Sequence, residues 1–340
     1  MEEINKVIVK QQPKLTGQIG NTLIYVDPDL EDKSIDITEN GMYTITADEG
    51  YDALSTVEIN TNVEVPLVGY MSTACNSSGY ATHIVVGGIK NIPSYAFTSE
   101  YNKVAALGTR YLEEVTMLEG VETIGSRAFL THYTYNTALK KVNFPTTLKS
   151  IGYRAFTECR NLTVTELPDG LETIGDYAFW FTNTPLTKLP SSLTSLGSGA
   201  FRESTLIAIK TIPDGVTTIG QETFHRCTAL KQISMKNVKT IGNGGTSYQT
   251  FQSCSALKAV WIGSAINTNG AGIYRYSFDG CSNLSKIFID LPRATVETFE
   301  SYQYGFMNNT SKTGIIICND DPGFMSKEEF DAIDWDTYTG

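Results

Sequence analysis

The sequence predicts a β-rich α/β solenoid, in which short units stack on one another and share one continuous interior. The first observation is a recurring pattern of Ile-Gly, two variable residues, Ala or Thr, and Phe. The second is its period of about 23 residues with short insertions, because so short a unit cannot bury a core of its own. The third is the alternation of apolar residues after each pattern, which favours a short β-strand. The recurrent phenylalanines are Phe97, Phe129, Phe156, Phe179, Phe201, Phe224, Phe251, Phe278 and Phe306.

Residues 1–65 lack this pattern, and we expect a small β module there. Residues 35–45 alternate apolar and polar side chains around Asn40-Gly41, a dipeptide that favours a hairpin turn. Further strand residues are expected at Val57 and Ile59, and later at Val63 and Val65. The stretch from residue 39 to residue 60 is similar to a short β module of phage and prophage proteins from Gram-positive bacteria.

The solenoid is expected over residues 66–318. A strand is predicted at residues 84–86, and the segments after Leu230, Leu257 and Leu284 predict strands that stack into a parallel sheet, with about 4.8 Å per coil. We expect the glycine after the recurrent isoleucine to permit a tight bend or a positive φ. The piece Ala-Phe-x-x-Cys is predicted to form one helical turn that buries the phenylalanine.

Residues 319–340 are expected to cap the last coil. A final strand is predicted at residues 314–317, followed by a helix over residues 326–333 with Ser326 as N-cap and Glu329 completing a capping box. We expect Phe330, Ile333 and Trp335 to cover the final open coil, because an uncovered terminal strand would be an edge that invites aggregation.

The repeat resembles that of the BspA-like leucine-rich repeat family of bacterial proteins. The resemblance is carried by the pattern Leu-x-x-Ile-Gly-x-x-Ala-Phe-x-x-Cys-x-x-Leu over residues 85–318. It implies a right-handed solenoid, typical of surface or secreted proteins that bind other molecules without catalysis. The repeats around Phe97 and Phe306 depart from the pattern, as terminal repeats of a solenoid often do.

Composition excludes some classes of partner. The formal net charge is −11, and a strongly acidic chain is a poor ligand for nucleic acids or anionic membranes. No apolar stretch is long enough to insert across a membrane. Residues 1–6 do not resemble a signal peptide, so we expect either that an export signal has been removed or that the protein leaves its cell by another route.

Four of the six cysteines lie three residues after an anchoring phenylalanine, and the last three of these, which are 27 residues apart, should stack in one column on adjacent coils. The column could hold disulfides or a metal, but repeat position alone explains the spacing, and we interpret the thiols as small apolar fillers. There is no Cys-x-x-Cys pair of the kind that marks zinc sites. The four cysteines are Cys159, Cys227, Cys254 and Cys281, and the last three form the column.

No other motif predicts catalysis, a metal or a cofactor. His83, His132 and His225 do not stand at metal-ligand spacing. Residues 242–247 are glycine-rich but lack the Lys-Ser/Thr of a phosphate-binding loop, so we expect an insertion loop. Residues 319–323 carry oxygen ligands without EF-hand spacing, and we expect a turn before the terminal helix.

The candidate binding site is a column of outward-facing residues on the predicted strands, polar in the early coils and apolar in the last three. Exposed aromatic side chains commonly mark binding surfaces, so the apolar end is the candidate. The alternative is that residues 319–340, or a second copy of the chain, cover the rings. Burial of both aromatic rings above 90% by residues 319–340 would contradict the binding patch. The column is Thr116, Asn143, Ser234, Trp261, Phe288 and Ile316, of which the last four are the binding candidates.

These observations predict a protein without enzymatic activity that recognises a protein or a glycan through the solenoid face. Residues 1–65 would attach it to a larger assembly. A phage or prophage particle and a bacterial cell surface, where it would act as an adhesin, are the two settings that we consider. A glycan-processing enzyme on a solenoid scaffold is the alternative, and it would require a pocket with two facing carboxylates.

Overall fold

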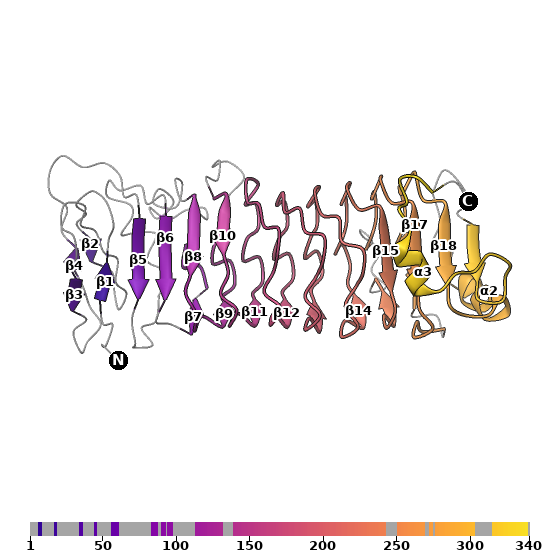
Figure 1. Cartoon of the computed structure of the whole chain (residues 1–340), viewed down its shortest axis with the longest axis horizontal. Helices are drawn as coiled ribbons and strands as arrows, with labels where there is room; N and C mark the ends of the chain where they lie inside the picture. Colours follow the sequence, from indigo (N-terminus) through magenta and orange to yellow (C-terminus); the bar gives the residue numbers. More distant parts are fainter. Residues whose placement is uncertain are drawn as a thin grey trace. The chain divides into compact units, whose positions relative to one another are not determined.

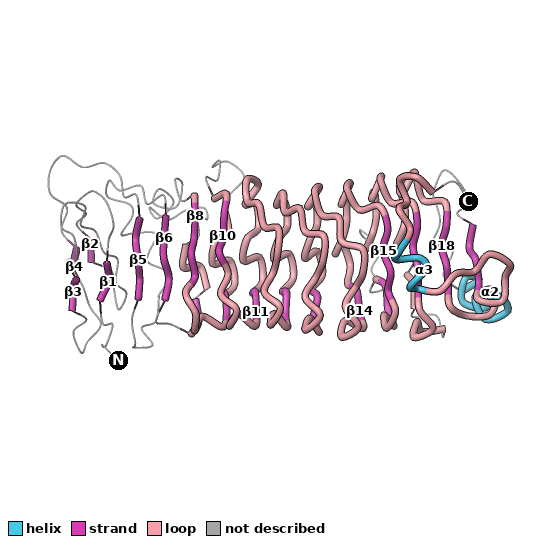
Figure 2. Tube along the Cα trace, in the orientation of Figure 1, coloured by secondary structure: helices cyan, strands magenta, loops and turns pink. Residues whose placement is uncertain are grey.

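The computed structural model divides the chain into two compact units, residues 1–164 and residues 165–340. Most of each coil is loop and turn, and the strands are short (Figures 1 and 2). The described residues comprise six N-terminal strands and longer stretches of the solenoid. They are residues 6–8, 17–18, 34–36, 44–45, 56–60, 83–87, 90–92, 94–97, 113–131, 139–242, 250–268, 272–274, 276–302 and 315–338.

In the first unit, parallel strands of successive coils pair side by side, as the repeat predicts. The pairing is in register, with Val142 opposite Val115 and Val115 opposite Ile84. A second row of two-residue strands carries the Ile of the Ile-Gly pairs, with Ile151 opposite Ile124. The first row contains β6 (His83–Gly87), β8 (Glu114–Met117) and β10 (Lys141–Asn143), and the second contains β7 (Asn91–Ile92), β9 (Thr123–Ile124) and β11 (Ser150–Ile151).

The N-terminal strands join the first row directly. β5 (Thr56–Asn60), which contains the predicted Val57 and Ile59, pairs in parallel with β6, and β1 (Lys6–Ile8) pairs antiparallel with β5. The hairpin predicted around Asn40-Gly41 is wrong among the described strands. β3 (Ser34–Asp36) pairs with β1, whereas β4 (Thr44–Ile45) pairs with β2 (Gly17–Gln18) in a different sheet. Asn40-Gly41 itself lies outside the described residues.

The second unit repeats the same arrangement. Its longer strands form one parallel sheet in the order β15, β17, β18, β19, and the two-residue strands again carry the recurrent Ile or Leu. Two helices follow β18 and β19 (Figure 1). The elements are β12 (Thr173–Ile174), β13 (Ser195–Leu196), β14 (Thr218–Ile219), β15 (Gln232–Met235), β16 (Thr240–Ile241), β17 (Ala259–Ile262), β18 (Lys286–Ile289), α2 (Arg293–Tyr302), β19 (Ile315–Cys318) and α3 (Lys327–Ala332).

The recurrent phenylalanines form ring ladders in the interior of both units, which confirms the central prediction. In the first unit the centroids of Phe129 and Phe156 lie 5.1 Å apart, with the ring planes 2° from parallel. In the second unit Phe251 and Phe278 lie 5.2 Å apart at 5°. All eight described ladder residues are buried. Phe306 lies outside the described residues. Each coil thus completes the core of its neighbours.

The Ala-Phe-x-x-Cys piece forms overlapping β-turns, so the prediction of a helical turn is wrong. Ala155 N donates to Gly152 O at 3.2 Å, and Cys159 N donates to Phe156 O at 3.2 Å. The third residue of each of these two turns has a positive φ, 53° at Arg154 and 65° at Glu158, which an α-helix does not allow.

These turns leave alternate main-chain N–H groups free to bond to the next coil. Phe129 N donates to Ala155 O at 2.8 Å, and Arg127 N donates to Tyr153 O at 2.7 Å. A helical turn would direct its N–H groups along its own axis instead. The stack therefore favours turns because they let coils bond to each other.

The glycine of the Ile-Gly pair is explained mainly by the close approach of adjacent coils. A Cβ atom on Gly197 would lie 2.3 Å from Asp176 N on the preceding coil. The alternative reason, a positive φ, applies at Gly242, where φ is 94°.

The cysteine column is buried and its thiols are free, and the structure adds a role that the filler interpretation omitted. Cys254 Sγ donates to Phe224 O of the preceding coil at 3.0 Å, and Cys281 Sγ donates to Phe251 O at 3.1 Å. Ser204, at the same repeat position, donates to Phe179 O at 2.7 Å. The position therefore selects a small side chain that can donate a hydrogen bond between coils.

The outer edge of the terminal strand β19 is capped by an ion pair rather than by the predicted apolar residues Phe330, Ile333 and Trp335. Asn319 N donates to Leu291 O, so alternation turns the main-chain groups of Ile316 and Cys318 away from β18. Arg293 Nη2 donates to Ile316 O at 2.8 Å, and Cys318 N donates to Asp321 Oδ2 at 2.7 Å. Arg293 and Asp321 also pair with each other. Arg293 and Asp321 thus occupy the carbonyl of Ile316 and the N–H of Cys318, to which another strand would otherwise bond.

The ring ladder predicts a large cost for removing one of its members. Phe201→Ala should lower the free energy of unfolding by about 3–5 kcal/mol, because it opens a cavity against both adjacent rings. Chemical denaturation measures this change. The exposed Leu206→Ala is the control and should change stability by less than about 0.5 kcal/mol. Similar small losses in both variants would contradict the ladder.

The thiol-to-carbonyl contact predicts an order of stability at Cys254. Cys254→Ser keeps the donor, whereas Cys254→Val keeps the bulk and loses the hydrogen bond, which contributes about 1 kcal/mol. We expect the serine variant to be the more stable of the two in thermal denaturation. A valine variant that is as stable as the serine variant, or more stable, would show that this position only fills space.

Candidate functional site

Three of the predicted binding residues lie in one column across neighbouring strands. Ser234 on β15 is opposite Trp261 on β17, and Trp261 is opposite Phe288 on β18. The fourth assignment is wrong by one residue, because Phe288 is opposite Ile317 on β19, whereas Ile316 is opposite Ile287. Residues 315–317 are three consecutive isoleucines, so the alternation of apolar and polar residues that fixes a register is missing there.

The prediction that this column forms an exposed aromatic patch is also wrong. Trp261 is 4% exposed, while Phe288 and Ser234 are fully buried. The cover is the chain's own C-terminal segment, residues 324–338, which is the alternative that the sequence left open. Its rings contact Phe288 directly: the centroid of Phe330 lies 5.9 Å from that of Phe288, and the centroid of Trp335 lies 6.3 Å from it.

Helix α3 carries Phe330, the first of these rings, and sets its position. As predicted, Ser326 caps it: Glu329 N donates to Ser326 Oγ at 3.2 Å, and Ser326 N donates to Glu329 Oε2 at 2.8 Å. The capping box fixes where the helix begins, and Phe330 then lies on its buried side. The helix packs against β15 and so lies over the strand face.

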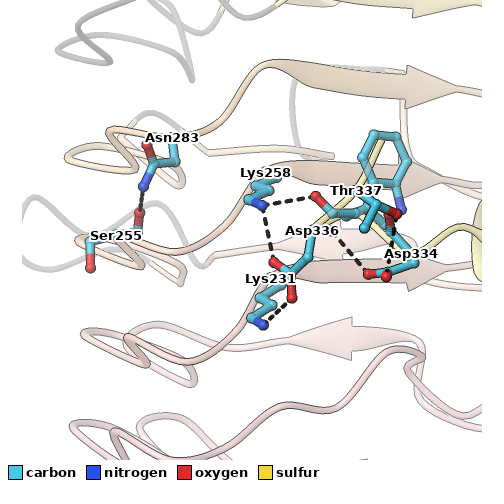
Figure 3. A network of polar contacts seen from close by, with 8 residues as sticks. Lys231, Ser255, Lys258, Asn283, Asp334, Asp336 and Thr337 are labelled. Atoms are coloured by element: carbon cyan, nitrogen blue, oxygen red, sulfur yellow. Dashed lines mark hydrogen bonds and ion pairs between the residues drawn. The ribbon is translucent and has the colours of Figure 1, made fainter. Parts of the chain in front are cut away.

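Polar contacts hold the end of the segment to the coil corners (Figure 3). Asp336 pairs with Lys231 and with Lys258, whose Nζ lies 3.0 Å from Asp336 Oδ1. Lys258 Nζ also donates to Trp335 O at 2.8 Å. On the next coil Lys286 Nζ lies 4.8 Å from the centroid of the Tyr338 ring. We call Lys231, Lys258 and Lys286 the lysine row.

The lysine row lowers the pKa of Asp336. Hydrogen bonds from Lys231, and then from Lys258, hold the pKa of Asp336 below its ordinary value of 3.8. The same contact raises the pKa of Lys231. Sequence analysis missed the row, although Lys231 and Lys258 each directly follow a recurrent leucine, and that repeat position was a usable signal.

The strand face of the first unit is polar and carries a network of its own. Asn143 Nδ2 donates to Thr116 Oγ1 at 2.9 Å and to Glu114 Oε1 at 2.6 Å. Lys141 Nζ lies 2.6 Å from the same Glu114 oxygen. Sequence analysis named Thr116 and Asn143 but missed Glu114 and Lys141, which stand two residues earlier and therefore share the face.

The second unit contains two acidic side chains close to one arginine, on the turns around the phenylalanines. Arg202 pairs with Glu222, and its Nε lies 3.3 Å from Glu203 Oε1. The guanidinium also stacks over the Trp180 ring at 5.3 Å. Both carboxylates thus neutralise an arginine in a half-buried network. The enzyme alternative would need two carboxylates facing a pocket, which this ion-paired arrangement does not provide.

The remaining candidates can be placed only in part. Burial, then Arg202 and Arg226, lower the pKa of His225 to about 4, so its imidazole is neutral at pH 7. The His83 side chain, His132 and most of the 242–247 loop lie outside the described residues. In the part of the chain that the structure describes, no group of three or more His, Cys, Asp or Glu side chains is arranged to hold a metal ion.

The acidic turn at residues 319–323 is explained by its contacts. Arg293 N donates to Asp320 Oδ1 at 2.8 Å, and Asp321 pairs with the Arg293 side chain. Burial raises the pKa of the neighbouring Cys318 thiol to about 11. As for membranes, none of the helices described combines the length and the apolar composition needed to cross one.

Comparison with known proteins identifies a repeat family. The family model described as BspA type leucine-rich repeat region matches in six copies, over residues 72–183, 130–258 and 247–321. No curated protein matches the chain.

Solved structures of bacterial leucine-rich repeat proteins are similar at low identity. One from Bacteroides ovatus is 20% identical over 69% of this chain and 67% of its own, with a TM-score of 0.42. The T. pallidum protein TpLRR is 15% identical over 91% of this chain and 100% of its own, with a TM-score of 0.40. A leucine-rich cell surface protein from Faecalibacterium prausnitzii is 20% identical over 86% and 89%, with a TM-score of 0.27.

The ion pairs of Asp336 predict a pH dependence with a definite sign. Because the folded-state pKa is depressed, the pairs stabilise the fold above pH 3.8, and this contribution is lost as the pH falls below 3.8 through the folded value. Asp336→Asn should therefore be less stable than the natural chain at neutral pH, with the difference shrinking in acid. Denaturation curves at a series of pH values measure it. A difference that is constant or grows in acid would contradict the assignment.

Proposed function

The chain belongs to the BspA-type leucine-rich repeat family, and from this premise we propose that it is a non-catalytic protein that recognises a protein or a glycan through its strand face. The family match covers residues 72–321, which include every described coil and the whole candidate site up to β19. Solenoids present broad surfaces built from the same position of successive repeats, and such surfaces suit recognition of an extended partner.

The polar network on β8 and β10 is the observation that carries this proposal. Thr116 and Asn143 are half-buried, so each is both anchored and accessible. The hydrogen bonds among Asn143, Thr116 and Glu114 hold donors and acceptors in fixed positions before any partner arrives. Preorganised polar groups lose little conformational entropy on binding, which favours recognition of a polar ligand.

The proposal assigns a different role to each of three regions of the chain. Residues 1–65 attach the protein to a larger assembly, residues 66–318 form the recognition solenoid, and residues 319–340 close the strand face of its last coils. The bacterial cell surface or a phage particle is the setting that we propose, because both need a non-catalytic element that contacts another surface. The polar face of the first unit then meets the ligand.

A binding screen with matched variants tests the proposal. Arrays of bacterial and host glycans and of surface proteins should yield a ligand, and Asn143→Ala should weaken its binding by about ten-fold, because the amide organises the network. Arg160→Ala, an exposed change on the turns of the same unit, is the control and should bind normally. A ligand that binds both variants equally would show that the strand face is not the recognition surface.

A further inference from the structure

We infer that β15, β17 and β18, together with the lysine row, form a peptide-recognition site, which residues 324–338 of this chain occupy and an acidic, aromatic segment of a partner protein can take over. The inference deepens the proposed function, on which it rests, by naming the class of partner. Under this inference the predicted residues Ser234, Trp261 and Phe288 belong to a binding site, although they are buried in this structure.

The chemistry of the occupant defines what the site accepts. Its apolar side chains pack on Trp261 and Phe288, and its carboxylate at Asp336 meets two members of the lysine row. The chain as a whole carries a net charge of −11, so three lysines in a row are a local exception. Their pairing with an acidic segment is therefore a specific charge match. A partner must therefore bring aromatic residues with acidic residues close to them.

The contacts to main-chain atoms favour a peptide over a glycan. Trp261 Nε1 donates to Met325 O at 3.0 Å, and Lys258 Nζ donates to Trp335 O at 2.8 Å. Two side chains of the coils thus recognise carbonyl groups that any polypeptide supplies. Specificity then comes from the aromatic and acidic side chains between and beyond these two anchors.

The chain's own segment fits the site incompletely. Trp335 Nε1 and Gln232 Nε2 are both buried, and neither has a hydrogen-bond partner among the described residues. Gln232 lies on β15 opposite Ala259, which belongs to the same apolar cluster. Buried donors without acceptors cost free energy. A partner segment that places an oxygen near Gln232 Nε2 would relieve this cost and compete better than residues 324–338.

The segment can leave without opening the phenylalanine ladder, although its departure uncovers Trp261 and Phe288. The ring ladder and the thiol column lie inside the coils, and Phe278 is stacked on Phe251 without any contribution from the segment. The ion pairs at its end are half-exposed, and exposed pairs contribute little to stability. Gly323, with a φ of 86°, follows the residues held by Arg293 and is where the segment would swing away.

The test measures binding of a fluorescent peptide of residues 322–340 to the full-length chain by anisotropy. The tail-released variant carries Phe330→Ser and Trp335→Ser. These changes remove the aromatic contacts of the segment with Phe288 and leave the residues of the coils unchanged. We expect it to bind the peptide at least about ten-fold more tightly than the natural chain, whose own segment competes. A peptide with Trp335→Ala should bind about ten-fold more weakly, and Lys258→Ala in the variant should weaken binding of the natural peptide.

Two outcomes overturn the inference. A tail-released variant that keeps its circular dichroism spectrum and cooperative unfolding yet does not bind the peptide shows that the face is not a recognition site. A variant that unfolds shows that the segment is an inseparable part of the core. Neither outcome touches the proposed function at β8 and β10, because Asn143→Ala tests that surface in the other unit.

Discussion

The whole structure depends on the burial of one phenylalanine per coil against its neighbours. A coil of this length has no second layer, so a Phe ring becomes buried only when the rings before and after it stack on it. The other repeated features serve that stack. The paired turns direct N–H groups toward the next coil, glycine lets backbones approach closely, and the thiol or hydroxyl donates to the carbonyl of a phenylalanine one coil away.

Features that residue type and spacing mark were predicted correctly from the sequence, and features without such a mark were missed. The ring ladder, the strands after Leu230, Leu257 and Leu284, and the capping box at Ser326 are each marked by residue type and spacing. The turn type was missed because the residues at positive φ, such as Arg154 and Glu158, are not glycines. The register of β19 was missed because three consecutive isoleucines carry no alternation.

The candidate site shows the same limit in a different form. Alternation correctly placed Trp261 beside Phe288, but no pattern within a repeat can say that a segment outside the repeats will fold onto them. The polar contacts of that segment with the coils join residues separated by 52 to 120 positions, such as Trp261 with Met325 and Lys231 with Asp336. Such pairs depend on the completed stack, which supplies both the aromatic surface and the lysine row.

In this account the coils and the segment that covers them are stabilised to different degrees, and hydrogen–deuterium exchange followed by mass spectrometry tests that claim most directly. The inter-coil amides of Phe201 and Phe224 should be among the most protected of the chain, because only loss of the stack exposes them. Amides of residues 324–338 should exchange earlier, as one group. Exchange of the segment and the coils at a single common rate, or fast exchange at Phe201 and Phe224, would contradict the account.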